Sequence, residues 1–466
     1  MRALAWFSRD SIVAPPGYSR WLIPPAALAV HLSIGQAYAY SVFKSPIETY
    51  FDVDKTASGW VFSIAIVMLG VSAAFGGTWV ESRGPRKAMF LAACCFSGGF
   101  LISALGVVTH QIWLVYLGYG FVGGIGLGIG YISPVSTLIK WFPDRPGLAT
   151  GMAIMGFGGG ALIASPWSSS MLGAFGLESE GSVATAVPAA ALVGPFVIHA
   201  VVYFAFMMFG VIMVRLPAPG WHPKGYDPAT AQLRPMQTRA DVNANQALRT
   251  PQFWLLWTVL FLNVTAGIGI LEGAEPMILD FFGSEVSHAA AAGFVALLSF
   301  ANMSGRIGWS ATSDFLGRKP TYMMYLGVGA LAYLLVTTVG QASLLLFVLL
   351  TVLMLSYYGG GFATVPAYLK DLFGTFQVGA IHGRLLTAWS AAGIAGPYII
   401  NAIADAQAAA GVTGAELYIP GLRIMVGLLV VGFIANWLIK PVSERHHMPA
   451  GHVEAELAVP AAGKDS

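Results

Sequence analysis

The stretch Gly77-Thr-Trp-Val-Glu81-Ser-Arg83-Gly84-Pro-Arg86-Lys87 separates two long apolar segments, and a shorter version, Asp314-Phe-Leu-Gly317-Arg318-Lys319, begins 233 residues after Glu81. Each copy has a carboxylate at the end of an apolar segment, followed by a glycine and a basic pair. Further residues recur at an offset of 232: Pro134, Gly147 and Gly151 meet Pro366, Gly379 and Gly383. Such self-similarity at a fixed offset predicts a tandem duplication of one structural unit.

The composition places this unit in a membrane. Of the 466 residues, 56% are hydrophobic and only 10% are charged, whereas about 25% are charged in soluble domains. A membrane-spanning helix needs roughly 20 apolar residues. The windows without charge are 22–43, 56–80, 88–139, 146–177, 181–214, 250–271, 286–305, 320–369, 385–404 and 424–439. Since 88–139 and 320–369 each hold two spans, we expect an all-α membrane protein with twelve transmembrane helices in two six-helix pseudo-repeats.

The positive charges predict the orientation. With both termini inside, 20 of the 24 Lys and Arg residues fall in cytoplasmic segments, while the acidic residues divide evenly, as the positive-inside rule requires. We therefore expect a multi-pass protein of the inner (plasma) membrane with both termini cytoplasmic. The predicted parts are a six-helix bundle (1–216), a cytoplasmic linker (217–250), a second six-helix bundle (251–440) and a cytoplasmic tail (441–466).

The repeated loop resembles the signature loop of the major facilitator superfamily. A carboxylate at a helix end, a glycine turn and a basic pair can form a breakable charge latch, which we assign to Glu81, Arg86, Asp314 and Arg318. The alternative is a solvated loop that only sets topology. Glu81 stands where the family usually has Asp, and Ser310 replaces a glycine, so the strength of the latch differs from the family pattern.

Seven further motifs, in order along the chain, resemble the oxalate/formate antiporter family, which neighbours the proton-linked monocarboxylate carriers. The motifs are Tyr38-Ala-Tyr40-Ser-Val-Phe43, Gly130-Tyr-Ile-Ser-Pro134, Lys140-Trp-Phe-Pro-Asp144, Gly156-Phe-Gly-Gly-Gly160, Pro251-Gln-Phe-Trp254, Gly359-Gly-Gly-Phe362 and Leu386-Thr-Ala-Trp389. The resemblance implies a transporter of small carboxylates.

Arg306 is the strongest candidate for substrate binding. An arginine in the apolar part of a membrane helix costs at least about 3 kcal/mol and usually serves function, and its planar fork matches a carboxylate. Asn302 lies one turn away on the same face. The family resemblance also implies a substrate-binding arginine at this position in helix eight. The alternative is that Arg306, about 12 Å along the helix from Asp314, extends to the interface.

Trp389 stands where the resemblance implies a lysine in oxalate-specific members. A single cation suits a monoanion, which favours pyruvate, lactate or formate over oxalate. The aromatic, amide and imidazole groups that could orient the rest of the substrate are Tyr131, Asn263, Tyr357, Tyr358 and His382, with packing roles as the alternative. His31 and Glu272 are candidate proton carriers, or else a core histidine and an interfacial acid.

The sequence thus predicts a secondary active transporter of a small carboxylate, working by alternating access as an exchanger or coupled to protons. An oxalate/formate antiporter is the alternative, and a transport-like carboxylate sensor is a further one. An enzyme is not expected, because His-Glu-x-x-His and Gly-x-Ser-x-Gly motifs are absent from the sequence. We expect no cofactor, no metal and no nucleic acid. The expected partners are the carboxylate, the lipid bilayer and protons or a counter-anion, and we expect a monomer.

Overall fold

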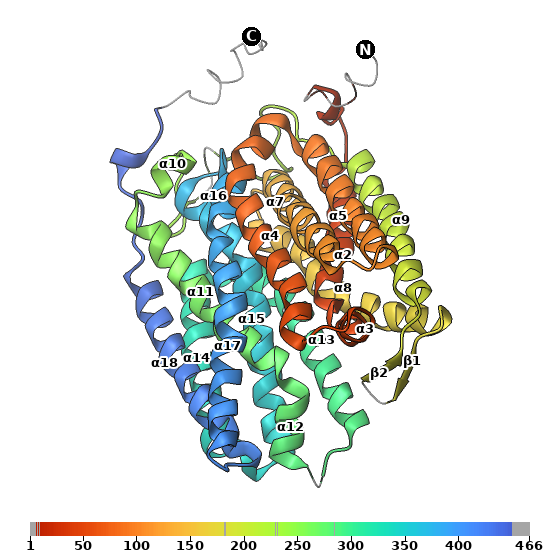
Figure 1. Ribbon diagram of the computed structural model, residues 1–466. Helices are drawn as coiled ribbons and strands as arrows, with labels where there is room; N and C mark the ends of the chain where they lie inside the picture. Colours follow the sequence, from red (N-terminus) through yellow and green to blue (C-terminus); the bar gives the residue numbers. More distant parts are fainter. Residues whose placement is uncertain are drawn as a thin grey trace.

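In the computed structural model the chain is a bundle of long helices (Figure 1). The structure describes residues 6, 8, 10–180, 183–228, 230, 232–283 and 285–449. The first and last described helical turns, near Asp10 and Glu444, and the described residues of the segment 217–250 lie at one end of the bundle, which we call the linker side. The other end is called the opposite side. The part of the predicted tail from 450 onward lies outside the described residues.

The first half of the chain contributes six helical passages, two of which are interrupted. The first passage changes to a five-residue 3₁₀ segment in its middle, and the fourth contains a π-helical segment. The bounds are η1 (Asp10–Ile12), η2 (Arg20–Leu22), α2 (Ile23–Ile34), η3 (Gly35–Ala39), α3 (Ser41–Phe51), α4 (Lys55–Arg83), α5 (Pro85–Val108), α6 (Ile112–Val115), η4 (Tyr116–Val122), α7 (Gly123–Trp141), α8 (Pro146–Ala174) and α9 (Ala189–Met213). A small antiparallel hairpin, β1 (Glu178–Glu180) and β2 (Val183–Ala186), joins α8 to α9 on the opposite side.

The second half repeats this arrangement, and the segment between the halves contains only the short α10 (Ala244–Ala247) among its described residues. The bounds are α11 (Pro251–Glu272), α12 (Ala274–Phe282), α13 (His288–Leu316), α14 (Arg318–Thr338), η5 (Gly340–Ala342), α15 (Leu344–Phe373), α16 (Val378–Leu385), α17 (Thr387–Ala409), η6 (Gly414–Leu417), α18 (Ile419–Leu438) and η7 (Glu444–His446). The predicted domain limits at 216, 250 and 440 remain predictions.

Nine helices in the described part of the chain are long and apolar enough to cross a membrane. The other three predicted spans coincide with α2–η3–α3, α13 and α16–α17. Two of these are interrupted, and α13 carries polar and charged residues in its second half, so their apolar stretches are shorter or weaker. The prediction of an all-α membrane fold is confirmed.

The two halves meet through a small number of helices. The helix α4 packs against α16 and α17, while α8 packs against α13 and α15. Glycines permit this approach: a Cβ on Gly151 would lie 2.8 Å from the carbonyl oxygen of Arg306, and one on Gly383 would lie 2.1 Å from that of Ala73. Gly151 and Gly383 are one of the pairs repeated at an offset of 232. The repeat therefore preserves the small residues on which the contact between halves depends.

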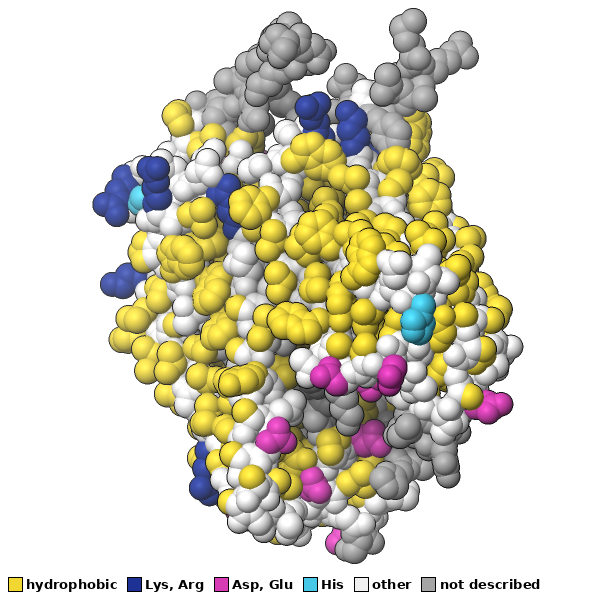
Figure 2. All heavy atoms as spheres, in the orientation of Figure 1, with side chains coloured by type: hydrophobic (Ala, Val, Ile, Leu, Met, Phe, Trp, Pro, Cys, Tyr) yellow, Lys and Arg dark blue, Asp and Glu magenta, His cyan; other side chains and the backbone are white. Residues whose placement is uncertain are grey.

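The surface agrees with a membrane location. On the face seen in Figure 2, hydrophobic side chains form a broad band around the middle of the bundle. Most of the Lys and Arg side chains on this face lie toward the linker side, and most of the Asp and Glu side chains lie toward the opposite side. The distribution of Lys and Arg on this face agrees with the predicted asymmetry of positive charge, whereas the sequence predicts that the acidic residues divide evenly.

Candidate functional site

The centre of the candidate site is Arg306, about two-thirds of the way along α13. Its side chain is completely buried. The Nε atom donates a hydrogen bond to Oδ1 of Asn302 at 3.1 Å, and Nη1 donates to the carbonyl oxygen of Ile154 at 3.2 Å. Nη2 is buried without a hydrogen-bond partner in the structure. Because Ile154 belongs to α8, the guanidinium lies between the two halves. It does not extend to the membrane–water interface, which is the alternative that the sequence leaves open.

The charge of Arg306 is not neutralised by an ion pair with any of the residues that the structure describes. The ion pairs found among the described residues join other groups, and none includes Arg306. An unpaired buried charge is costly, and several kcal/mol are lost per ion that leaves water without compensation. A guanidinium that is buried, held at two nitrogens and free at the third is therefore prepared to bind an anion.

Aromatic rings surround the guanidinium. Its central carbon lies 5.2 Å from the ring centroid of Phe362 on α15 and 5.8 Å from that of Phe157 on α8, within the range of cation–π attraction. The ring of Tyr131 is 5.4 Å from Phe157 and 5.7 Å from Phe362. The ring of Trp389 is 6.1 Å and 5.9 Å from the same two phenylalanines. Tyr131 and Trp389 are thus neighbours of Arg306 through shared ring contacts.

Unpartnered polar atoms gather around these rings. Buried polar groups are nearly always hydrogen-bonded, so a cluster that is not suggests a ligand or water between its members. Among the buried side-chain atoms without a partner in the structure, those near these rings are Nη2 of Arg306, Nε1 of Trp389, Nε2 of His31, both ring nitrogens of His382, and the hydroxyl oxygens of Tyr38, Tyr131 and Tyr358. They come from the first, fourth, eighth, tenth and eleventh passages, which include both halves.

Two histidines pack against Tyr131. The ring centroid of His31 on α2 is 5.2 Å from that of Tyr131, and the centroid of His382 on α16 is 5.7 Å from it. Nδ1 of His31 pairs with the carbonyl oxygen of Ala27 at 3.0 Å. Both histidines are buried. The structure thus brings together two residues that the sequence assigned separate roles.

A single glycine makes room for the arginine. A Cβ on Gly158 would lie 2.6 Å from Nε of Arg306 and 3.0 Å from its Cδ and Cζ. A methyl group cannot occupy that space while the arginine keeps its position. Gly158 belongs to the Gly156-Phe-Gly-Gly-Gly160 motif, which thereby supplies both a wall ring and the space for the guanidinium.

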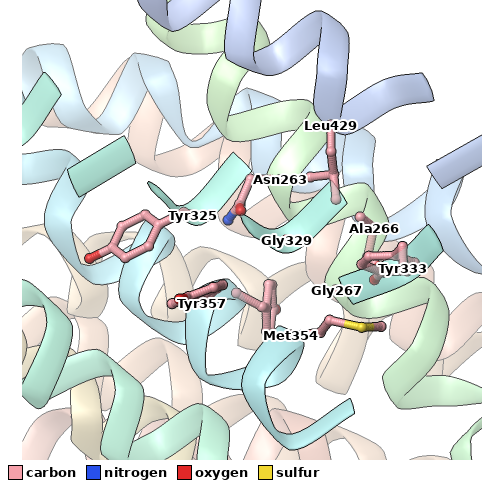
Figure 3. A pocket seen from close by; sticks show the side chains of 10 residues that line it. Asn263, Ala266, Gly267, Tyr325, Gly329, Tyr333, Met354, Tyr357 and Leu429 are labelled. Carbon is pink, nitrogen blue, oxygen red and sulfur yellow. The ribbon is translucent and has the colours of Figure 1, made fainter. Parts of the chain in front are cut away.

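Asn263 and Tyr357 lie apart from this cluster. Both line a small pocket within the second half, formed by α11, α14, α15 and α18 (Figure 3). The ring of Tyr357 is 5.2 Å from Trp309 and 5.6 Å from Tyr325. Tyr358, the next residue on α15, also lines the pocket but is close enough to Arg306 and Tyr38 to interact with them electrostatically. The structure therefore places Tyr358, and not Tyr357, among the unpartnered polar groups of this cluster.

The side chain of Glu272, a candidate proton carrier, lies outside the described part of the chain. Three wall residues were not singled out from the sequence: Tyr38, Phe157 and Phe362. Each of them nevertheless belongs to one of the motifs that carry the family resemblance. Membership in those motifs was the signal that could have identified them.

The first latch carboxylate, Glu81, reaches across the boundary between the halves. Its Oε1 accepts a hydrogen bond at 3.1 Å from the backbone N–H of Gly379. Gly379 is the second residue of α16. The other partners of Glu81 are Nζ of Lys140, at 2.6 Å, and the hydroxyl of Ser136, at 2.6 Å. A carboxylate at a helix N-terminus is stabilised by the unpaired N–H groups and the helix dipole.

The second carboxylate, Asp314, makes the matching contact in the other direction. It accepts hydrogen bonds from the backbone N–H groups of Gly147 and Leu148, both at 2.8 Å, in the first turn of α8. It also forms an ion pair with Arg318 at 2.5 Å, and Arg318 bonds to Asp371 at 3.2 Å. Each half thus holds the start of one helix of the other half, and both contacts lie on the linker side.

The two basic residues of the predicted latch do not behave alike. Arg318 pairs with Asp314, but the bonds of Arg86 go to the carbonyl oxygens of Trp6 and Val211 and to the hydroxyl of Ser11. These partners belong to the N-terminal segment and to α9. In the first half it is therefore Lys140, from a different helix, that pairs with the loop carboxylate.

Comparison with known proteins supports the fold and the class. The sequence model of the Major Facilitator Superfamily matches residues 26–397. The oxalate:formate antiporter of Oxalobacter formigenes is 26% identical over 389 residues, which cover 83% of this chain and 85% of that protein. Apicoplast pyruvate carrier 1 of Toxoplasma gondii is 23% identical over 386 residues, 75% of this chain and 70% of the carrier. The crystal structure of the transporter FucP in the outward conformation superimposes with a TM-score of 0.65 at 12% identity, covering 90% of this chain and 97% of FucP.

Proposed function

Because the chain belongs to the Major Facilitator Superfamily, we propose that it is a secondary active transporter that carries a small carboxylate anion across the inner membrane by alternating access. The observation that carries this proposal is the buried guanidinium of Arg306, which lies between the two halves with Nη2 unpartnered and forms no ion pair with a carboxylate among the described residues. A substrate carboxylate would supply the missing negative charge and bind in the planar geometry that guanidinium groups favour.

The same site favours a small monoanion. Arg306 supplies the one permanent positive charge, and the wall around it consists of aromatic rings, two histidine rings and single hydrogen-bond donors. A second carboxylate would have no permanently charged partner and would be buried at a cost of several kcal/mol. Trp389, at the position where the family resemblance implies a lysine, contributes only an indole N–H. Pyruvate, lactate and formate are therefore the favoured substrates.

Oxalate/formate exchange is the second candidate, and it is supported by the similarity to the antiporter of Oxalobacter formigenes. Both candidates share the same fold and the same arginine. They differ in whether a dianion is accepted.

The structure is compatible with one state of an alternating-access cycle. The hydrogen bonds between the halves run from the two latch carboxylates inward to the carbonyl oxygens of Ile154, in the third turn of α8, and Ile66 of α4. These contacts close the linker side. If that side is cytoplasmic, as the positive-inside rule indicates, this is the state in which the cytoplasmic path is shut.

The test is flux through the purified protein in lipid vesicles. Vesicles loaded with unlabelled pyruvate, lactate, formate or oxalate are given the same radiolabelled anion, and exchange is followed. We expect exchange of the three monoanions and at least tenfold slower exchange of oxalate. Arg306→Ala should abolish exchange, whereas Arg423→Ala, which removes an exposed arginine on α18, should not.

Three results would contradict the proposal in different ways. Normal exchange by Arg306→Ala would place the site elsewhere, and oxalate as the fastest substrate would support the antiporter alternative. Binding of a carboxylate without any flux would identify a sensor.

A further inference from the structure

His382 differs from the other histidines buried in the described part of the bundle. His31 pairs one ring nitrogen with the carbonyl oxygen of Ala27, and His199 pairs one with the hydroxyl of Ser168 at 3.2 Å. His382 is 1% exposed, and neither of its ring nitrogens has a partner. A neutral imidazole needs one acceptor for its N–H and one donor for its lone pair. Leaving both unmatched is costly unless the ring serves another state of the protein.

The position of His382 ties it to both the substrate site and the latch. Its ring faces Tyr131, whose own ring contacts Phe157 and Phe362 around Arg306. It is also three residues, about one helical turn, from Gly379, whose N–H is held by Glu81. The helix α16 is thus the element that carries the histidine and that the latch fixes to the other half.

The charges around His382 are few. From α7 it faces Tyr131, from α2 His31 lies within electrostatic range, and Glu81 of α4 is already paired with Lys140 of α7. The remaining titratable groups on the packed elements have other partners or lie elsewhere. These are Arg384 on α16, bonded to Asn245 of α10; Lys370 and Asp371 at the linker-side end of α15; and Asp405 at the far end of α17. Tyr358 on α15 is the exception, because its buried hydroxyl has no partner in the structure.

We infer that His382 is the site that binds the proton transported together with the carboxylate. This rests on the proposed function, since it concerns the same binding site. In the empty site the positive charge of Arg306 disfavours a second cation. When a carboxylate binds, Arg306 is neutralised and the anion itself attracts a positive imidazolium.

Binding of the anion and binding of the proton therefore promote each other. By linkage the effect is reciprocal. The proton passes from water on the open side to a ring nitrogen of His382, and it returns to water on the other side after the anion leaves. One anion and one proton move together, so no net charge crosses the membrane.

The arrangement also explains how the proton would be released on the other side. Opening the linker side requires α16 to separate from α4, because Glu81 and the close approach of Gly383 to Ala73 hold those helices together. That movement exposes the helix on which His382 lies. His31 lies on α2 of the first half, which is not one of the two helices that separate in this movement.

The experiment compares driven accumulation with passive exchange in vesicles. When the solution outside the vesicles is one pH unit more acidic than the inside, wild type should accumulate pyruvate about tenfold, as one proton per anion requires. His382→Gln should lose the accumulation, with a ratio near one, while exchange remains detectable. His110→Gln, which changes a histidine that packs on Tyr50 and Phe51 away from the site, should accumulate like wild type.

A binding measurement separates titration from a structural effect. In weakly buffered solution the wild-type protein should take up about one proton for each pyruvate bound, and His382→Gln should take up none. If His382→Gln does not fold, His382→Asn is used in its place, with its melting temperature as the check.

The outcomes distinguish this inference from the proposed function. No exchange by wild type would contradict the function itself. Exchange by wild type without accumulation under the pH gradient, accumulation by His382→Gln, or loss of accumulation only in His31→Gln would overturn the role of His382 and leave the function intact.

Discussion

The guanidinium of Arg306 is positioned by groups that carry no charge. A carboxylate of the protein would neutralise it permanently and compete with the substrate. Instead Asn302 and the carbonyl oxygen of Ile154 hold two nitrogens at 3.1 and 3.2 Å, and two phenylalanine rings lie beside it. These groups fix the direction of the fork and leave its charge available. Preorganisation of this kind lowers the cost of binding.

The first prediction concerns the space beside that fork. Gly158→Ala places a methyl group where the arginine side chain lies, 2.6 Å from Nε, and overpacking of this kind costs about 1–3 kcal/mol. We expect the affinity for the substrate to fall about tenfold or more, with the protein still folded. Isothermal titration with pyruvate measures it. Gly173→Ala, in the same helix but with open space at its Cβ, is the control, and equal affinities of the two variants would show that Arg306 is not held by this contact.

At the scale of single elements, the helices α8 and α16 begin at the same kind of contact. Each starts just after a loop and has a carboxylate from the other half at its first N–H groups. The carboxylates follow from the duplicated loop, in which Gly84 and Gly317 take positive φ values of 86° and 88°. A residue with a Cβ is strained there, so glycine allows each helix to end and the next to begin directly.

The second prediction is that these contacts keep the linker side closed. Each charge at a helix N-terminus contributes about 0.3–2 kcal/mol, so the double variant Glu81→Gln and Asp314→Asn should shift the equilibrium toward opening. The reporter is Ser390→Cys, at a buried position whose hydroxyl bonds to the carbonyl oxygen of Ile66 in the other half, in a background with Cys94 and Cys95 replaced by Ala. We expect its reaction with an impermeant thiol reagent added on the linker side to become several-fold faster.

The control for this prediction neutralises two exposed carboxylates on the opposite side, Glu178→Gln and Asp405→Asn. These changes should leave the rate of labelling at Ser390→Cys as it was. If the double latch variant also reacts at the original rate, the loop carboxylates do not control closure.

At the scale of the whole molecule, charge and topology agree. The linker, which carries Lys224, Arg234, Arg239 and Arg249, lies at the same end as the first and last described turns, η1 and η7. Arg234 further donates hydrogen bonds to the carbonyl oxygens of Asp314 and Phe315 at the end of α13. The linker therefore both contributes positive charge and contacts the second half at its latch.

The third prediction is that the linker side is cytoplasmic. Exposed single cysteines are introduced at Lys224→Cys in the linker and at Glu178→Cys in the hairpin on the opposite side, again without the two native cysteines. An impermeant reagent added to intact cells should label only Glu178→Cys, and inside-out vesicles should show the reverse. Labelling of Lys224→Cys in intact cells would invert the topology.

Several features depend on local sequence alone. The apolar windows indicate the spans, because helix length and hydropathy are properties of consecutive residues. The offset of about 232 residues indicates the duplication. Arg306 could be singled out because the cost of a charge in an apolar segment does not depend on knowing its neighbours, and Asn302 because residues four apart share one helix face.

Only the tertiary structure decided which residues meet. Tyr357 and Tyr358 are both tyrosines and are consecutive on α15, so the sequence alone does not distinguish them. Consecutive residues on a helix differ by about 100° in direction, and packing determines which of them joins the cluster around Arg306. The pairing of Glu81 with Lys140, where the sequence predicts Arg86, has the same origin, since Lys140 comes from another helix. The enclosure of His382 beside Tyr131 likewise requires α16 and α7, from different halves, to be in contact. Sequence periodicity fixes the faces of each helix, whereas the rotation of one helix against another is set by close packing between segments far apart in the chain.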